Sequence, residues 1–290
     1  MVIFYKELTL VTVVFSLICA GFFHFAAVKI QHADNVPLVL VKFFDPLLFE
    51  QGKAEVKKNG CCRTISGIKG LIVPHHLLPS TMLSEAFQTL VQARPRTVVL
   101  IGPNHHEVGT ASIQHATFNW LTPFGQVYVN SSPENIFAPA KLEHAENEHS
   151  LSGMMPYIRT YLPKATVRSF MIRRYASVEE LERFISKVKK LDTEETVYIA
   201  SVDFSHYLSS SVAEANDAKT LAWIKSFSLK SIMNSNNDYM DSPPSIYVLL
   251  RLMQEFKTTK FTLLGNTNSG RILKDPYIET TSYITATFSR

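Results

Sequence analysis

The chain of 290 residues has only 3 cysteines, too few for a disulfide framework. Cys19 lies inside an apolar N-terminal stretch, and Cys61 and Cys62 are adjacent. Neighbouring Cα atoms lie too close together for an ordinary disulfide, so we interpret this pair as two free thiols. A surface metal or redox site at the pair is the alternative interpretation.

Charged residues are also scarce, at 19% of the chain, and the net charge of +4 comes from scattered lysines and arginines. The longest basic groupings are Arg173-Arg174 and Lys187 to Lys190, the second on a predicted helix. We interpret that run as a solvated helix face and expect no nucleic-acid partner. The chain contains no internal repeat and no low-complexity tract.

The N-terminus contains the one long apolar run. Leu8 to Val28, 21 residues, contains no Asp, Glu, Lys or Arg, and a helix needs roughly 20 apolar residues to cross a bilayer. Residues 1–28 are therefore predicted to be a signal anchor, or alternatively a cleaved signal peptide. The corresponding localisation is membrane-anchored with an extracytoplasmic domain, or secreted if the segment is cleaved. We expect residues 29–67 to be a connector and residues 68–290 to form the folded domain.

Within residues 68–290, strand-like and helix-like patterns alternate, and the hydrophobic content of 46% is enough for a large core. The predicted strands are Lys69 to Val73, Thr97 to Ile101, Val167 to Ile172, Thr196 to Val202, Phe261 to Leu264 and Ser282 to Phe288. The predicted helices between them include the segments from Ser80, Ser150, Ser177, Val212 and Ser245. This alternation predicts an α/β fold, a three-layer sandwich with a central, mostly parallel sheet, preceded by the N-terminal membrane segment.

Histidine clusters follow several of these elements. Of the 10 histidines, six occur in Pro74-His75-His76, Asn104-His105-His106, Glu148-His149 and Asp203-Phe204-Ser205-His206. Ligands in open α/β sheets bind beyond the carboxyl ends of the strands, where these clusters are predicted to lie. Each cluster alone is more often structural, as turn chemistry or a helix cap. Together they predict a metal or acid–base pocket, beside a helix start that favours an anion.

The ordered set of motifs resembles the MEMO family (AmmeMemoRadiSam system protein B). The motifs are Pro74-His75, Gly102-Pro103-Asn104-His105-His106, Thr122-Pro123-Phe124-Gly125, Glu148-His149-Ser150, Ser201 to Tyr207 and Thr281-Ser282-Tyr283. That family is similar in fold to class III extradiol dioxygenases, which hold a non-haem iron with two histidines and one carboxylate. The resemblance implies His75, His105 and Asp241 as metal ligands, a set typical of Fe(II) oxygenases. A role for Asp241 as the cap of the following helix is the alternative.

The resemblance also implies catalytic roles for His149 and His206, in proton transfer or substrate binding, and for Asp203, in orienting a histidine. Where the family typically has Pro-His-Ala-Gly-Tyr, this chain has Pro74-His75-His76-Leu77-Leu78, which changes the pocket wall. The N-terminal segment implies the membrane as a partner, an unknown small molecule or peptide is the expected ligand, and the resemblance implies a functional association with AMMECR-type and radical-SAM proteins.

Three functions remain open from the sequence. The first is a non-haem iron oxidoreductase with Fe(II) on His75, His105 and Asp241. The second is a zinc hydrolase that uses the same ligands. The third is a non-enzymatic protein that binds a peptide or a metal, with copper as a further candidate ion.

Overall fold

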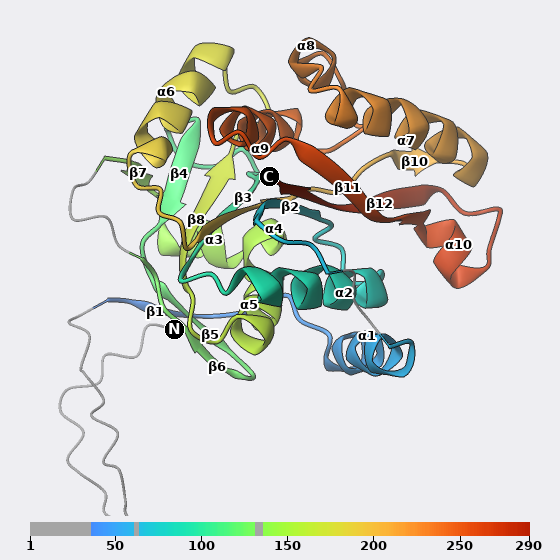
Figure 1. The fold of residues 1–290 in the computed structure, drawn as a ribbon, viewed down its shortest axis with the longest axis horizontal. Coiled ribbons are helices and arrows are strands. Elements are labelled where there is room, and N and C mark those ends of the chain that lie inside the picture. Colours follow the sequence, from blue (N-terminus) through green and yellow to red (C-terminus); the bar gives the residue numbers. More distant parts are fainter. Residues whose placement is uncertain (1–35, 61–63, 131–135) are drawn as a thin grey trace, which may run out of the picture. The chain divides into compact units, whose positions relative to one another are not determined.

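The computed structural model describes residues 36–60, 64–130 and 136–290 (Figure 1). Residues 36–290 form one compact unit. Within the expected connector, the described part contains a short strand, β1 (Leu38–Leu40), and a helix, α1 (Pro46–Lys58). Both contribute buried side chains to the core, Val39 from β1 and Phe49 from α1. Cys61 and Cys62 lie outside the described residues.

The main sheet has 9 strands in the described part of the chain, in the order β10-β12-β2-β9-β3-β8-β4-β7, with β11 paired to β12. Their bounds are β2 (Ile68–Val73), β3 (Thr97–Pro103), β4 (Ile113–Ala116), β7 (Ala138–Pro139), β8 (Thr166–Ile172), β9 (Thr196–Ser201), β10 (His206–Leu208), β11 (Lys260–Asn268) and β12 (Thr280–Ser289). A separate 3-stranded sheet joins β1 to β5 (Asn119–Thr122) and β6 (Gly125–Val127).

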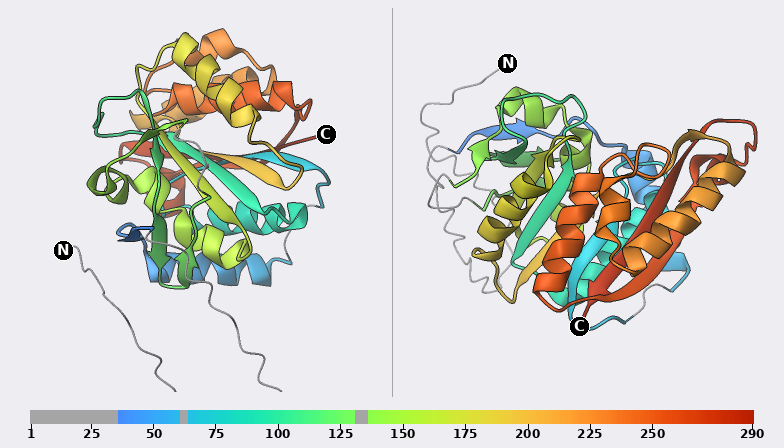
Figure 2. Two further views of the ribbon diagram at one scale, coloured as in Figure 1. Left: turned by 90° about the vertical axis from the view of Figure 1, so that its left-hand side faces the viewer. Right: turned by 90° about the horizontal axis from the view of Figure 1, so that it is seen from above.

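Helices cover both faces of the main sheet (Figures 1 and 2). One face packs against α6 (Val178–Lys189), α7 (Ser210–Lys225), α8 (Leu229–Met233) and α9 (Pro243–Glu255). The other packs against α2 (Ser80–Leu90), α4 (His149–Ser152), α5 (Met155–Tyr161) and the small sheet, and α1 packs against α2. The remaining helical segments are η1 (Val91–Ala93), α3 (Leu142–Glu146) and α10 (Ser269–Leu273).

The prediction of a mostly parallel sheet is wrong, because the sheet is mixed. The four central strands β2, β9, β3 and β8 are parallel. Antiparallel pairs flank them on both sides, with β12 against β2 and β4 against β8. The reason lies in the connections: parallel neighbours need a crossover, usually through a helix, whereas β4 follows β3 after a short loop and returns antiparallel.

The prediction of a membrane-anchored protein with an extracytoplasmic domain also needs correction. Among the helices of residues 36–60, 64–130 and 136–290, none combines the length and hydropathy that a membrane-spanning helix requires. The segment behind the prediction, Leu8 to Val28, lies outside the described residues.

Helix α1 packs closely against the start of α2. A Cβ atom on Gly52 would lie 2.4 Å from the backbone oxygen of Ser80, so only glycine permits this approach. On the same buried face of α1, the ring of Phe49 contacts Phe44, Phe124 and Tyr157 at centroid distances of 4.8–5.4 Å. These contacts make α1 part of the core.

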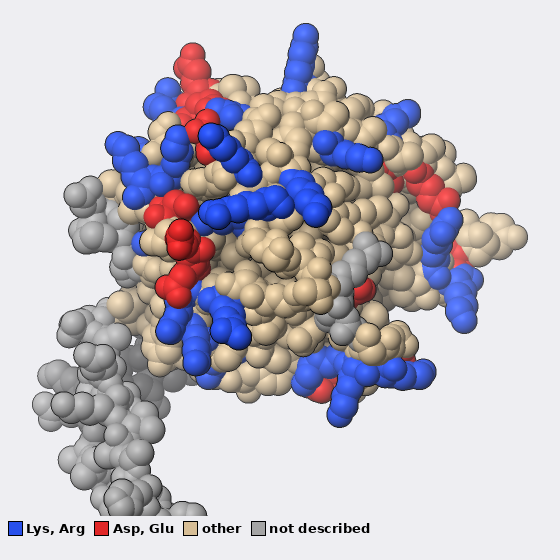
Figure 3. Space-filling model, viewed as in Figure 1, with Lys and Arg blue, Asp and Glu red and all other residues tan. Residues whose placement is uncertain are grey.

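Basic and acidic side chains are interspersed on the face shown in Figure 3. The lysines of α6 illustrate the pattern, because they make local contacts. Lys187 donates to the backbone oxygen of Ile136 at 2.8 Å, and Lys189 forms an ion pair with Glu255 at 2.6 Å. Two lysines of the Lys187–Lys190 run therefore bind neighbouring groups of the same protein.

Candidate metal centre

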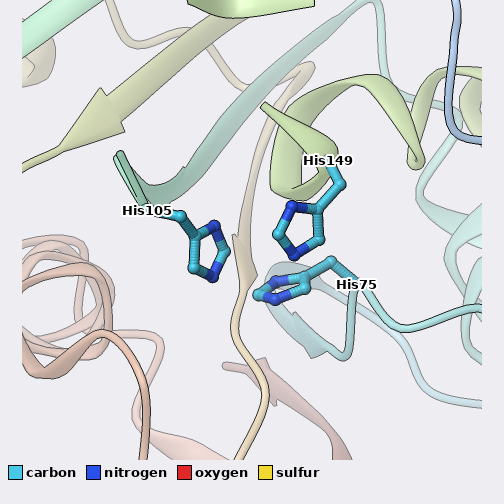
Figure 4. A group of neighbouring side chains, drawn as sticks. All are labelled: His75, His105 and His149. Carbon is cyan, nitrogen blue, oxygen red and sulfur yellow. The ribbon is translucent and has the colours of Figure 1, made fainter. Parts of the chain in front are cut away.

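Three neighbouring parallel strands bring the predicted site residues to one edge of the sheet. Strands β2, β9 and β3 lie side by side, and their carboxyl ends lead to His75, Asp203 and His105 respectively. The short helix α4 adds His149 at its first position, and Figure 4 shows the three imidazoles facing one another. Asp241 reaches the same place from the loop before α9.

Two imidazoles approach the same carboxylate oxygen. Nε2 of His75 lies 3.1 Å from Oδ2 of Asp241, and Nε2 of His105 lies 3.5 Å from the same oxygen. The other ring nitrogens point outward: Nδ1 of His75 is 3.3 Å from the backbone oxygen of Ser201, and Nδ1 of His105 is 2.7 Å from Oε1 of Glu148. An imidazole held at one nitrogen and free to ligate at the other is the usual arrangement of metal-binding histidines.

Glu148 is a site residue that the sequence interpretation did not assign. It is the N-cap of α4, is only 1% exposed, and accepts the backbone N–H of Ser150 at 3.0 Å. It also accepts the backbone N–H of His105 at 2.8 Å in addition to the ring nitrogen. The anion predicted at this helix start is thus a side chain of the protein itself. A Glu immediately before a histidine at a helix start was the available signal.

Asp203 and Asp241 are linked through their backbones. The N–H of Asp241 donates to the backbone oxygen of Asp203 at 3.1 Å, and the N–H of Asp203 faces Oδ2 of Asp241 at 3.3 Å. Asp203 also accepts the backbone N–H of His75 at 3.0 Å. The cap of α9 is Ser242, whose side chain accepts from the N–H of Ser245, so Asp241 is not needed as the cap.

Burial disfavours the charged form of the two histidines that face Asp241, but nearby carboxylates outweigh it. Asp203 and Asp241 raise the pKa of His75 above its ordinary value. Asp241 and Glu148 raise the pKa of His105 to about 10. At neutral pH without a metal, the ring of His105 therefore carries a proton on Nε2, where a cation would bind.

The pKa values of Glu148, Asp241 and His149 are instead lowered. Although burial opposes ionisation, His105 lowers the pKa of Glu148 to about 2, and His75 and His105 hold the pKa of Asp241 well below its usual range. Burial, followed by the positive charges of His75 and His105, lowers the pKa of His149 to about 3. At neutral pH, His149 is therefore a neutral imidazole beside the charged ring of His105.

Two overlapping sets of side chains are arranged so that they can hold a metal ion. His75, His105 and His149 form one set and His75, Asp203 and Asp241 the other, with the ligand atoms of each set within 4.8 Å of one another. Oδ1 of Asp241 is buried and has no hydrogen-bond partner among the described residues, although buried carboxylate oxygens are normally satisfied. Imidazole nitrogens with carboxylate oxygens suit a transition-metal ion, so the donors fit the predicted chemistry.

His206 belongs to neither set. It begins β10, where it pairs with Thr281 of β12, and its buried Nδ1 has no hydrogen-bond partner within residues 36–60, 64–130 and 136–290. His206 lies near His76. Burial is the main cause that lowers the pKa of His76; His75 and His206 lower it further, and Asp203 opposes them. Nδ1 of His76 in turn lies 2.5 Å from the hydroxyl of Tyr283.

Comparison with known proteins places these motifs in a family. A profile of the Memo family, described as Memo-like protein, matches residues 49–287. A "MEMO1 family protein" of Methanococcus maripaludis strain C5 is 27% identical over 203 residues, which cover 64% of this chain and 70% of the relative. One from Thermococcus onnurineus is 30% identical over 151 residues, or 47% of this chain and 52% of the relative. The crystal structure of an uncharacterized protein from Escherichia coli K12 aligns with a TM-score of 0.44 and 11% identity, covering 75% of this chain and 99% of that one.

Proposed function

Since the chain belongs to the Memo-like protein family, we propose that it binds a divalent transition metal through His75, His105 and Asp241 and acts as a non-haem iron oxidoreductase on a small molecule. The observation that carries the proposal is the convergence of two Nε2 atoms on one oxygen of Asp241, at 3.1 and 3.5 Å. Two histidines and a carboxylate are the ligand set of Fe(II) oxygenases. When bound, the iron would supply redox chemistry and Lewis acidity.

Neighbouring groups of the protein would orient the ligand histidines. Glu148 fixes the ring of His105 through Nδ1, and the backbone oxygen of Ser201 lies beside Nδ1 of His75. Both contacts favour the tautomer with a free Nε2 lone pair once the ring has lost its extra proton. Asp203 holds the backbone of His75 in place, so the positions of these ligands are set by buried hydrogen bonds.

His206 is the group that we assign to proton handling at the substrate. Its Nδ1 makes no hydrogen bond in the described part of the chain, although it is buried. Histidine is a common general acid or base in enzymes, and an imidazole without a fixed partner can turn towards a bound substrate. His76, beside it, is held by the Tyr283 hydroxyl and would form part of the wall that receives the substrate.

The test is the metal content of the full-length protein purified without oxygen, compared with a His75→Ala/His105→Ala double variant. His144→Ala is the matched control, because His144 lies on α3 and outside both metal-capable sets. Near-stoichiometric iron in the native protein and the control, but not in the double variant, supports the proposal. An oxygen-uptake screen with catechol-like substrates would follow.

Other metal contents distinguish the alternatives. Zinc at the same ligands, with turnover independent of oxygen, would favour a metallohydrolase. Equal metal contents in the native protein and the double variant would refute the assignment of the ligands. Failure to bind iron, zinc or copper after reconstitution would leave a non-enzymatic binding protein.

A further inference from the structure

His149 lies among the metal-ligand candidates rather than beside them. Its ring centroid is 4.8 Å from that of His75 and 4.2 Å from that of His105. The ligand nitrogens of all three rings lie within 4.8 Å of one another, and Figure 4 shows the rings gathered around a common centre. Its position at the start of α4, directly after Glu148, keeps it there.

The ring of His149 is not anchored by a hydrogen bond in the described residues. Its nearest charged atom is Oε1 of Glu148, 3.7 Å from Nδ1, which is too long for a hydrogen bond. That oxygen is already engaged with Nδ1 of His105 at 2.7 Å and the N–H of Ser150 at 3.0 Å. His75 and His105 have outward-facing acceptors, whereas His149 keeps both nitrogens available.

One ion can reach all three imidazoles once the ring of His149 turns, because this ring is now stacked on that of His105 with 18° between the two planes. Metal–nitrogen bonds of about 2.1 Å mean that two nitrogens on one ion lie at most about 4.2 Å apart. The nitrogens lie within 4.8 Å of one another, so at most about 0.6 Å has to be closed to meet this limit. Because His149 has no hydrogen bond to break, a rotation of its ring is the least costly way to close the gap.

The geometry points to His149 as a fourth protein ligand, so that the metal is held by three imidazoles and Asp241. This inference rests on the proposed metal site and replaces the acid–base role that the family resemblance implied for His149. A third nitrogen ligand shifts the preference of the site towards Cu(II) and Zn(II) over the oxygen-preferring ions Mn(II) and Mg(II). It also leaves fewer open positions on the ion, because each protein ligand displaces a water or a substrate atom.

The test counts the nitrogens bound to Cu(II) in the full-length protein. Paramagnetic resonance of the Cu(II)-loaded protein reports coupling to each coordinated imidazole. We expect three imidazoles in the native protein, two in His149→Gln and three in the control His144→Gln. Competition with a chelator should show that His149→Gln weakens Cu(II) binding by at least about tenfold. Affinity alone does not separate a ligand from a neighbour that orients one, so the nitrogen count is decisive.

The outcomes separate this inference from the proposed function. Two imidazoles in the native protein, unchanged in His149→Gln, would overturn the ligand role while leaving a site built on His75 and His105 intact. Native protein that binds neither copper, zinc nor iron would overturn the proposed function itself. If His149→Gln does not fold, the count in the native protein still decides, because a two-histidine site cannot give three coordinated imidazoles.

Discussion

The substitution Glu148→Gln tests most directly whether this carboxylate orients His105 in the candidate metal site. Oε1 of Glu148 accepts from Nδ1 of His105 and from the N–H of Ser150, while Oε2 accepts the backbone N–H of His105. A glutamine replaces one of these oxygens with an N–H donor. In either orientation of the amide, at least one buried donor of His105 or Ser150 then faces another donor.

The size of the effect follows from this geometry. The lowering of the pKa of Glu148 from 4.5 to about 2 corresponds to about 3 kcal/mol in favour of its ionised form. The free energy of unfolding should therefore decrease in the variant at neutral pH, where the native carboxylate is charged. Loss of a carboxylate that orients a ligand histidine typically weakens metal binding 10–100-fold, or about 1.4–2.7 kcal/mol.

The assay is a competition titration with Zn(II) or Fe(II), with circular dichroism to establish that the variant is folded. Glu143→Gln is the matched control, because Glu143 lies on α3 with its side chain 69% exposed, and its affinity should stay within about twofold of native. A folded Glu148→Gln protein with native affinity would refute the claim that this carboxylate orients His105.

Three other outcomes test the electrostatics and the packing. In metal-free protein, the free energy of unfolding should fall as the pH rises from 6.5 to about 10, because folded His105 retains its proton over this range while the unfolded chain loses it; urea titrations of native and His105→Gln protein should differ in this slope. Phe49→Ala should cost about 3–5 kcal/mol in chemical denaturation, because Phe49 is 1% exposed. Leu47→Ala, at a position 81% exposed, should cost less than about 0.5 kcal/mol, and equal losses would contradict the packing of α1. Gly102→Ala should destabilise the protein by about 1–3 kcal/mol in thermal unfolding, since the new Cβ would lie 2.5 Å from Oγ of Ser150; a native melting temperature would contradict this close contact.

Local patterns explain which features were predictable. The capping box from Ser177 to Glu180 is present as predicted, with both hydrogen bonds formed. The predicted helix from Ser150 is divided into α4 and α5, with Pro156 in the first turn of α5, because proline suits a helix start and not its interior. Such features depend on residues a few positions apart, which a single sequence displays.

The mixed sheet could not be predicted from such local patterns. The order of strands and the direction of β4 and β12 depend on pairings between distant segments, which periodicity does not encode. The role of α1 was missed for the same reason, because its apolar residues are recognisable as core only once the small sheet and α5 pack against them.

The family and the strand ends at which His75 and His105 occur were recognisable from the sequence, because both depend on ordered local motifs. The atomic contacts of the site became visible in the folded chain: two imidazoles on one oxygen of Asp241, Glu148 behind His105, His149 within the cluster and His206 outside it. A motif specifies a residue type at a chain position, whereas a metal site depends on interatomic distances set by the packing of remote segments.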